Sequence, residues 1–70
     1  MRDEVIFELA RKHLDTTVTV YFANEYIKGW WFSIDADTNV IGVQRIVRKG
    51  KRNVYIDIDT IVAIEVTEDE

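Results

Sequence analysis

Residues 16–66 divide into five short β-forming runs separated by turn-forming residues. The first run alternates polar and apolar side chains from Thr16 to Phe22, a period of two that is typical of a strand with one buried face. Turns are expected at residues 23–25, 35–38 and 48–51, and Asp59-Thr60 separates the last two runs. The sequence therefore predicts five strands, at residues 16–22, 27–34, 39–47, 53–58 and 61–66.

A single helix is predicted before the sheet, over residues 3–14. Ile6, Leu9, Ala10 and Leu14 recur there at helical spacing. Acidic residues at the start and basic residues at the end complement the helix dipole. A helix of about three turns is marginal alone in water, so we expect its apolar stripe to contact the sheet.

Gly29 interrupts the second predicted strand and predicts a sharp bend or a close approach of two backbones. Trp31 is expected in the core, with Trp30 and Phe32 together on the opposite face of the strand. In a strongly bent strand we expect these two rings to fill the core as well. The alternative is that they face outward and mark an interface.

The 70-residue chain indicates one domain, residues 1–70, with an acidic tail at residues 67–70. The core of such a chain is modest. With no cysteine, disulfides and thiolate metal sites are excluded, and a single histidine disfavours a His-rich metal site, so we expect oligomerisation to support the core. The absence of cysteine fits a reducing cytoplasm, and no segment is long and apolar enough to span a bilayer. Neither a metal site nor a cofactor is predicted.

Little in the sequence supports catalysis or small-molecule binding. Ser33 is the only serine and His13 the only histidine, and no acidic residue has an evident base or nucleophile as a partner. The protein is therefore predicted not to be an enzyme.

Basic charge is concentrated in one segment. The formal net charge of −4 argues against a bulk electrostatic nucleic-acid binder. Five of the nine basic residues nevertheless lie between Arg45 and Arg52, around Gly50, which can adopt a positive φ. The segment reads either as a solvated turn or as an RNA contact multiplied by oligomerisation. The candidate RNA contacts here are Arg45, Arg48, Lys49, Lys51 and Arg52, with Tyr55 nearby to stack a base.

The last two predicted strands lack the residues that normally protect a sheet edge. Residues 61–66 carry one charge, and neither this segment nor Val54-Tyr55-Ile56 contains Lys or Pro. Either the barrel closes and hides these strands, or they pair with another subunit, and we expect pairing between subunits. If the fourth strand of one copy pairs with the fifth strand of its neighbour, the contact is head to tail and generates a ring.

Two segments resemble the two motifs of the Sm-like family, the Sm, LSm and Hfq proteins. In that family the first motif runs from a glycine through a core residue to an Asp and an Asn, which match Gly29, Trp31, Asp35 and Asn39. The second motif matches residues 54–62 in register. The resemblance covers residues 4–66 and implies an N-terminal helix on a five-stranded, strongly bent antiparallel barrel of Sm (SH3-like) type. It also implies homomeric RNA-binding rings, usually of six or seven subunits, with five also open.

The resemblance further assigns residues to a base pocket at the pore of such a ring. In the family an Asn hydrogen-bonds the base, a flat side chain stacks on it and an Arg closes the far side. Asn39 keeps the first role, whereas Asp37 and Asp57 stand at the other two positions. With Asp35, these carboxylates would line the pore with negative charge and repel RNA. We therefore predict a degenerate, acidic pore, and Asn39 also reads as an ordinary turn residue.

The leading functional prediction is a homo-oligomeric ring with an RNA-binding or RNA-chaperone-like role. It would contact RNA through the basic hairpin more than through the pore. The alternative is a structural or adaptor ring that binds protein partners and no RNA, which the net charge and the altered pocket favour.

Overall fold

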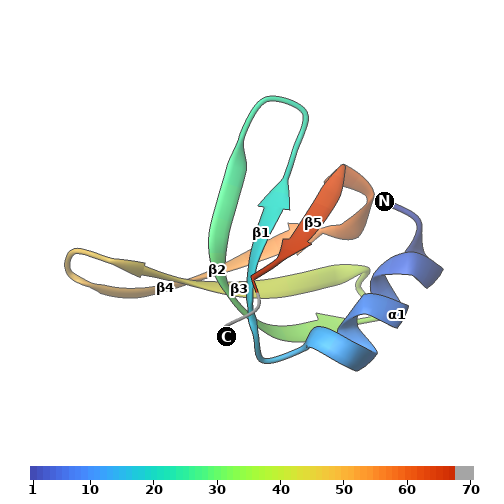
Figure 1. Ribbon diagram of the computed structural model, residues 1–70, viewed down its shortest axis with the longest axis horizontal. Helices are drawn as coiled ribbons and strands as arrows, with labels where there is room; N and C mark the ends of the chain where they lie inside the picture. The colour runs from blue at the N-terminus through green and yellow to red at the C-terminus, as the bar shows by residue number, and fades with distance from the viewer. Residues whose placement is uncertain (68–70) are drawn as a thin grey trace.

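The protein consists of one N-terminal helix and one antiparallel sheet (Figure 1). The computed structural model describes residues 1–67, so the predicted acidic tail lies almost entirely outside the described residues. The prediction of a helix followed by five strands is confirmed. The elements are α1 (Asp3–His13), β1 (Thr17–Tyr21), β2 (Tyr26–Asp35), β3 (Val40–Val47), β4 (Gly50–Asp57), a 3-10 helix η1 (Ile58–Thr60) and β5 (Ala63–Val66).

The strands lie in the order β4-β3-β2-β1-β5, and every neighbouring pair is antiparallel. Within residues 1–67, β4 pairs only with β3 and β5 only with β1, so the sheet is open and the predicted barrel is not closed. Figure 1 shows why: the β3–β4 hairpin extends away from the other elements. Its outer half is mostly exposed and carries charged residues on both faces, so it offers no continuous apolar face on which a closed barrel could form.

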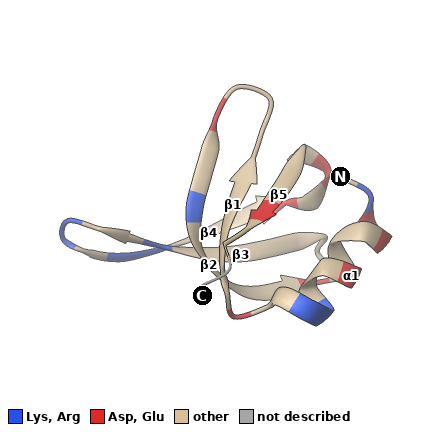
Figure 2. Ribbon diagram, viewed as in Figure 1, with Lys and Arg blue, Asp and Glu red and all other residues tan. Residues whose placement is uncertain are grey.

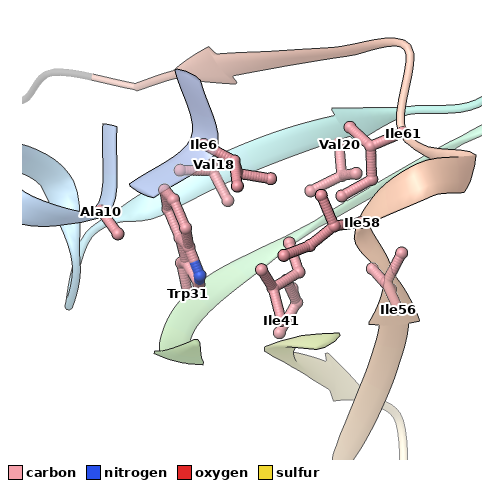
Figure 3. Packing of buried hydrophobic residues seen from close by; sticks show 10 residues of the cluster. Ile6, Ala10, Val18, Val20, Trp31, Ile41, Ile56, Ile58 and Ile61 are labelled. Atoms are coloured by element: carbon pink, nitrogen blue, oxygen red, sulfur yellow. The ribbon is translucent and has the colours of Figure 1, made fainter. Parts of the chain in front are cut away.

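The core lies between α1 and the concave side of the sheet (Figure 3). Trp31 is its largest fully buried side chain, as predicted, and Ile6 and Ala10 of α1 belong to the same cluster. The Trp31 indole Nε1 donates a hydrogen bond to the Ser33 carbonyl at 2.9 Å, so its one polar atom is satisfied. The sheet side of the core is completed by Val18, Val20, Ile41, Val43, Ile56, Ile58 and Ile61.

The aromatic residues beside Trp31 face the other side of the sheet, which we call the outer face. The register between β2 and β3 shifts between Trp31 and Ser33, which makes Phe32 a β-bulge. Phe32 covers Gly42 of β3, where an added Cβ would lie 2.7 Å from the ring. Trp30 is 42% exposed, so the prediction that it fills the core is wrong. The reason is that α1 packs on the Trp31 face and nothing among residues 1–67 covers the other.

Gly29 is placed as predicted, at a close approach of two backbones. A Cβ on this residue would lie 2.5 Å from the Gln44 carbonyl oxygen of β3, a contact that no side-chain movement can relieve. Most element boundaries differ from those predicted by one to three residues, and two of them change the type of structure assigned. Ile58 belongs to η1 rather than to the fourth strand, and β5 begins at Ala63 rather than at Ile61.

Within residues 1–67, no helix is long and apolar enough to cross a membrane.

Candidate nucleic-acid interface

Basic residues are concentrated on the projecting part of the β3–β4 hairpin, which we call the basic hairpin (Figure 2). Its tip is the two-residue connection Arg48-Lys49, because Val47 and Gly50 pair directly across the strands. Gly50 has a φ of 135°, which confirms the predicted positive φ at this position. The basic side chains are all exposed: Arg45, Arg48, Lys49, Lys51 and Arg52.

The structure corrects one detail of this segment. The turn was predicted over residues 48–51, but β4 already begins at Gly50. Lys51 and Arg52 therefore lie on a strand, with side chains on opposite faces of the sheet. Lys51 is on the outer face, opposite Ile46, while Arg52 is on the other face.

Arg45 and Arg52 are direct cross-strand partners. Two like charges in this position destabilise a sheet unless a counter-charge lies between them, typically by about 0.2–1 kcal/mol. The two ion pairs within residues 1–67 are Arg2–Glu4 and Glu8–Arg11, both on or next to α1. The basic hairpin thus has no internal acidic partner in the part of the chain that the structure describes, and it is ready to accept an anion.

The structure places Tyr55 farther from the tip of the basic hairpin than the sequence suggests. It pairs with Gly42 on the outer face and is 63% exposed, three positions from Arg52 along β4. Its ring meets Phe32 edge to face, with centroids 5.9 Å apart. Tyr55 therefore belongs to an aromatic row on the outer face rather than to the hairpin tip.

The residues of the predicted pore pocket lie at the opposite end of β3 and β4. Asn39 adopts a φ of 60° in the turn before β3, and its Nδ2 donates to the Asp57 carboxylate at 3.3 Å. The Asn39 carbonyl accepts a 2.9 Å hydrogen bond from the Ile58 amide, and Asp57 also accepts one from the Asp59 amide at 2.9 Å. Asn39 and Asp57 are thus brought together, but they already form hydrogen bonds with each other and with the backbone amides of η1.

The other two acidic residues of that pocket are in the β2–β3 turn. The Asp35 carboxylate accepts a 2.9 Å hydrogen bond from the Asp37 amide, which is an ordinary Asx turn. The carboxylate of Asp37 is exposed and makes no hydrogen bond within residues 1–67. No group of three or more metal-binding side chains occurs in this same stretch of the chain.

The acidic turn and the basic tip cannot form one site within a single chain. Residues Val40 and Val47 mark the two ends of β3. Seven residue steps along a strand correspond to about 23 Å. A nucleotide bound at the tip is therefore well beyond reach of Asn39, and the candidate RNA residues predicted from the sequence are divided among the hairpin, the acidic turn and, for Tyr55, the outer face between them.

Asp57 is expected to be a structural residue. Replacing it with Ala removes the N-cap of η1 and the partner of Asn39, so Asp57→Ala should lower the free energy of unfolding by about 1–2 kcal/mol. Asp37→Ala is the matched control, because the side chain lost there is exposed, and it should change stability by less than about 0.5 kcal/mol. Urea unfolding followed by tryptophan fluorescence measures both. Equal effects of the two substitutions would contradict the structural assignment of Asp57.

The sequence did not single out a groove at the base of the basic hairpin. It is lined by Trp30 and Lys28 of β2, by Gln44 and Ile46 of β3, and by Lys51 of β4, with Thr17 and Gly29 beside them. The alternation Lys28-x-Trp30-x-Phe32 was a usable signal, because it places these residues on one face. This alternation does not show which residues of the neighbouring strands lie beside Lys28 and Trp30.

Comparison with known proteins identifies no relative. No family model matches the chain, and neither a curated protein nor a solved structure does so. Functional assignment therefore depends on the chemistry of the residues above.

Proposed function

We propose that the protein is an Sm-like, ring-forming RNA-binding protein that contacts RNA through its basic hairpin. The observation that carries this proposal is the cross-strand pair Arg45–Arg52 beside the tip residues Arg48 and Lys49. A phosphate backbone placed along the hairpin would relieve the repulsion between the two arginines and gain contacts at the tip. In line with its lack of cysteine, we place the protein in the cytoplasm.

Assembly into a ring is part of the same proposal. β4 and β5 are the two outer strands of the sheet, as head-to-tail pairing between copies requires. A ring of five to seven subunits would carry one basic hairpin per subunit. Several weak phosphate contacts then act together on one RNA, which is how a chain with net charge −4 can still bind RNA.

The acidic end of β3 and β4 plays little part in this RNA binding. Asn39 and Asp57 are engaged with each other, and the negative charge of Asp37 and Asp57 disfavours a phosphate nearby. We therefore propose that uridine-rich RNA is not held at the pore.

Removing the tip charges tests the proposal. Arg48→Ala combined with Lys49→Ala should weaken the binding of labelled single-stranded RNA, measured by fluorescence anisotropy, for all RNA sequences tried. Each lost phosphate contact should reduce the slope of log affinity against log salt by about 0.7, hence by about 1.4 for each subunit in contact.

Arg11→Ala combined with Lys12→Ala is the matched control. It removes the same charge from the end of α1, away from the hairpin in Figure 2. This control should bind RNA with the affinity and salt slope of the wild type. An unchanged slope in the tip variant, or an equal loss in both variants, would argue against RNA binding through the basic hairpin.

An adaptor ring that binds protein is the second candidate. The observation that favours it is the aromatic row of Trp30, Phe32 and Tyr55, in which Trp30 and Tyr55 are exposed, since rings on a surface also serve protein interfaces. If the wild type assembles but retains no RNA at low salt, the adaptor ring becomes the better supported function.

A further inference from the structure

The groove at the base of the basic hairpin combines the two kinds of side chain that hold single-stranded nucleic acid. Its volume is about 450 Å³, and it opens on the outer face of the sheet. The indole ring of Trp30 lines the groove, and Lys28 and Lys51 supply positive charge. Among residues 1–67, no carboxylate side chain lines it. Proteins bind single strands without strong sequence preference by stacking bases on aromatic rings beside a basic track.

The side chain of Trp30 packs against a neighbouring aromatic ring, which limits its movement. Its ring lies 6.4 Å from that of Phe32, and Phe32 in turn meets Tyr55 at 5.9 Å. Phe32 rests on Gly42, so the row is anchored to the backbone of β3. A base stacked on the exposed part of Trp30 would therefore meet a surface that is already ordered, and little side-chain entropy would be lost on binding.

An amide pair beside the groove can contact the edge of a base. Gln44 and Asn53 are cross-strand partners on the outer face, and Gln44 Nε2 donates to Asn53 Oδ1 at 3.1 Å. This hydrogen bond leaves Gln44 Oε1 as an acceptor and a proton of Asn53 Nδ2 as a donor. An adjacent donor and acceptor match the hydrogen-bonding edge of a nucleobase.

The local charge also favours an anionic ligand. Two acids lie near the groove without lining it: Glu65 of β5, which pairs with Thr19 of β1 as Lys28 does, and Asp15, which lines a separate pocket on the other side of Trp30 and Thr17. The Glu65 carboxylate accepts a hydrogen bond from the Tyr21 hydroxyl at 3.1 Å, and this bond raises the pKa of Tyr21. Within residues 1–67, neither Lys28 nor Lys51 forms an ion pair. Both ammonium groups are therefore available to phosphate.

We propose that this groove is a nucleotide-binding subsite, in which a base of single-stranded RNA stacks on Trp30 while Lys28 and Lys51 hold its flanking phosphates. The inference rests on the proposed RNA binding and extends it from the hairpin tip to a base-contacting surface. Lys51 connects the two, because it belongs both to the basic hairpin and to the groove. RNA would contact the Arg45–Arg52 pair on the other face, cross the tip at Arg48 and Lys49, and continue along the outer face past Lys51 toward β2.

Tryptophan fluorescence tests the subsite directly. The chain has two tryptophans, of which Trp31 is fully buried and Trp30 is not, so a stacked base should quench Trp30 alone. Titration of the wild type with a single-stranded oligonucleotide at low salt should quench the emission saturably. Trp30→Leu should weaken binding measured by anisotropy roughly 5- to 150-fold, the range for loss of one stacked base. Trp30→Phe, which keeps a flat ring, should lose much less.

Tyr26→Leu is the control for the loss of an exposed aromatic. Tyr26 is also on the outer face of β2 but does not line the groove, so its variant should bind like the wild type. If RNA binds while Trp30 emission stays constant and Trp30→Leu binds normally, the subsite is wrong and binding by the hairpin stands. If the wild type binds no oligonucleotide by anisotropy, the proposed function fails, and the subsite fails with it.

Discussion

Trp31→Ala is expected to unfold the protein. Trp31 is the largest buried side chain and contacts the apolar side of α1, so its loss leaves a cavity in the centre of the core. Truncation of a buried tryptophan costs about 3–5 kcal/mol. A 70-residue domain has a total stability of only about 4–10 kcal/mol, with small domains toward the lower end. Circular dichroism and urea unfolding should show that most of the chain is unfolded even without urea.

The adjacent residue offers a matched control. Trp30→Ala removes the same side chain from the outer face, where 42% of the residue is already exposed. It should cost much less stability and leave a cooperative unfolding transition. Equal destabilisation by the two substitutions would mean that the two rings are not divided between core and surface as described.

Ile64→Pro is expected to break the assembly of the proposed ring. Thr67 lies opposite Thr17, and its amide donates to the Thr17 carbonyl at 3.0 Å. The alternation of an antiparallel ladder then directs the Ile64 amide away from β1, toward the open edge of β5. A proline there leaves the bonds to β1 in place but removes a donor for the neighbouring copy. We expect the native mass to fall from that of the ring to that of a single chain, 8.2 kDa.

Two controls separate the edge from the side chain and from the fold. Ile64→Ala keeps the edge amide and should still assemble, with some loss of stability because Ile64 packs against the core. Glu65→Pro removes the amide on the β1 side of β5, so it should damage the sheet itself. An Ile64→Pro variant that assembles like the wild type would exclude β5 as the interface strand.

Local sequence signals predicted much of this fold. The change from helical to alternating periodicity located α1 and all five strands, and Gly29 and Gly50 were correctly interpreted from the backbone geometry that glycine allows. Trp31 was correctly placed in the core because its neighbours alternate with it. These features depend on residues close together in the chain.

The features that were missed depend on contacts between distant residues. The exposure of Trp30 follows from the bulge at Phe32 and from which sheet face α1 covers, and neither is readable from β2 alone. The engagement of Asn39 with Asp57 joins two turns 18 residues apart. The groove requires residues from four strands to meet, so only the register of the sheet could reveal it.

The central claim is that copies of this chain assemble into a ring that holds RNA through the basic hairpins. It is tested most directly by purifying the wild type at low salt and recording its native mass together with its absorbance at the nucleic-acid and protein maxima. We expect five to seven times the chain mass of 8.2 kDa, and bound nucleic acid that is released as salt is raised. A folded 8.2 kDa monomer at micromolar concentration with no bound nucleic acid would contradict the account.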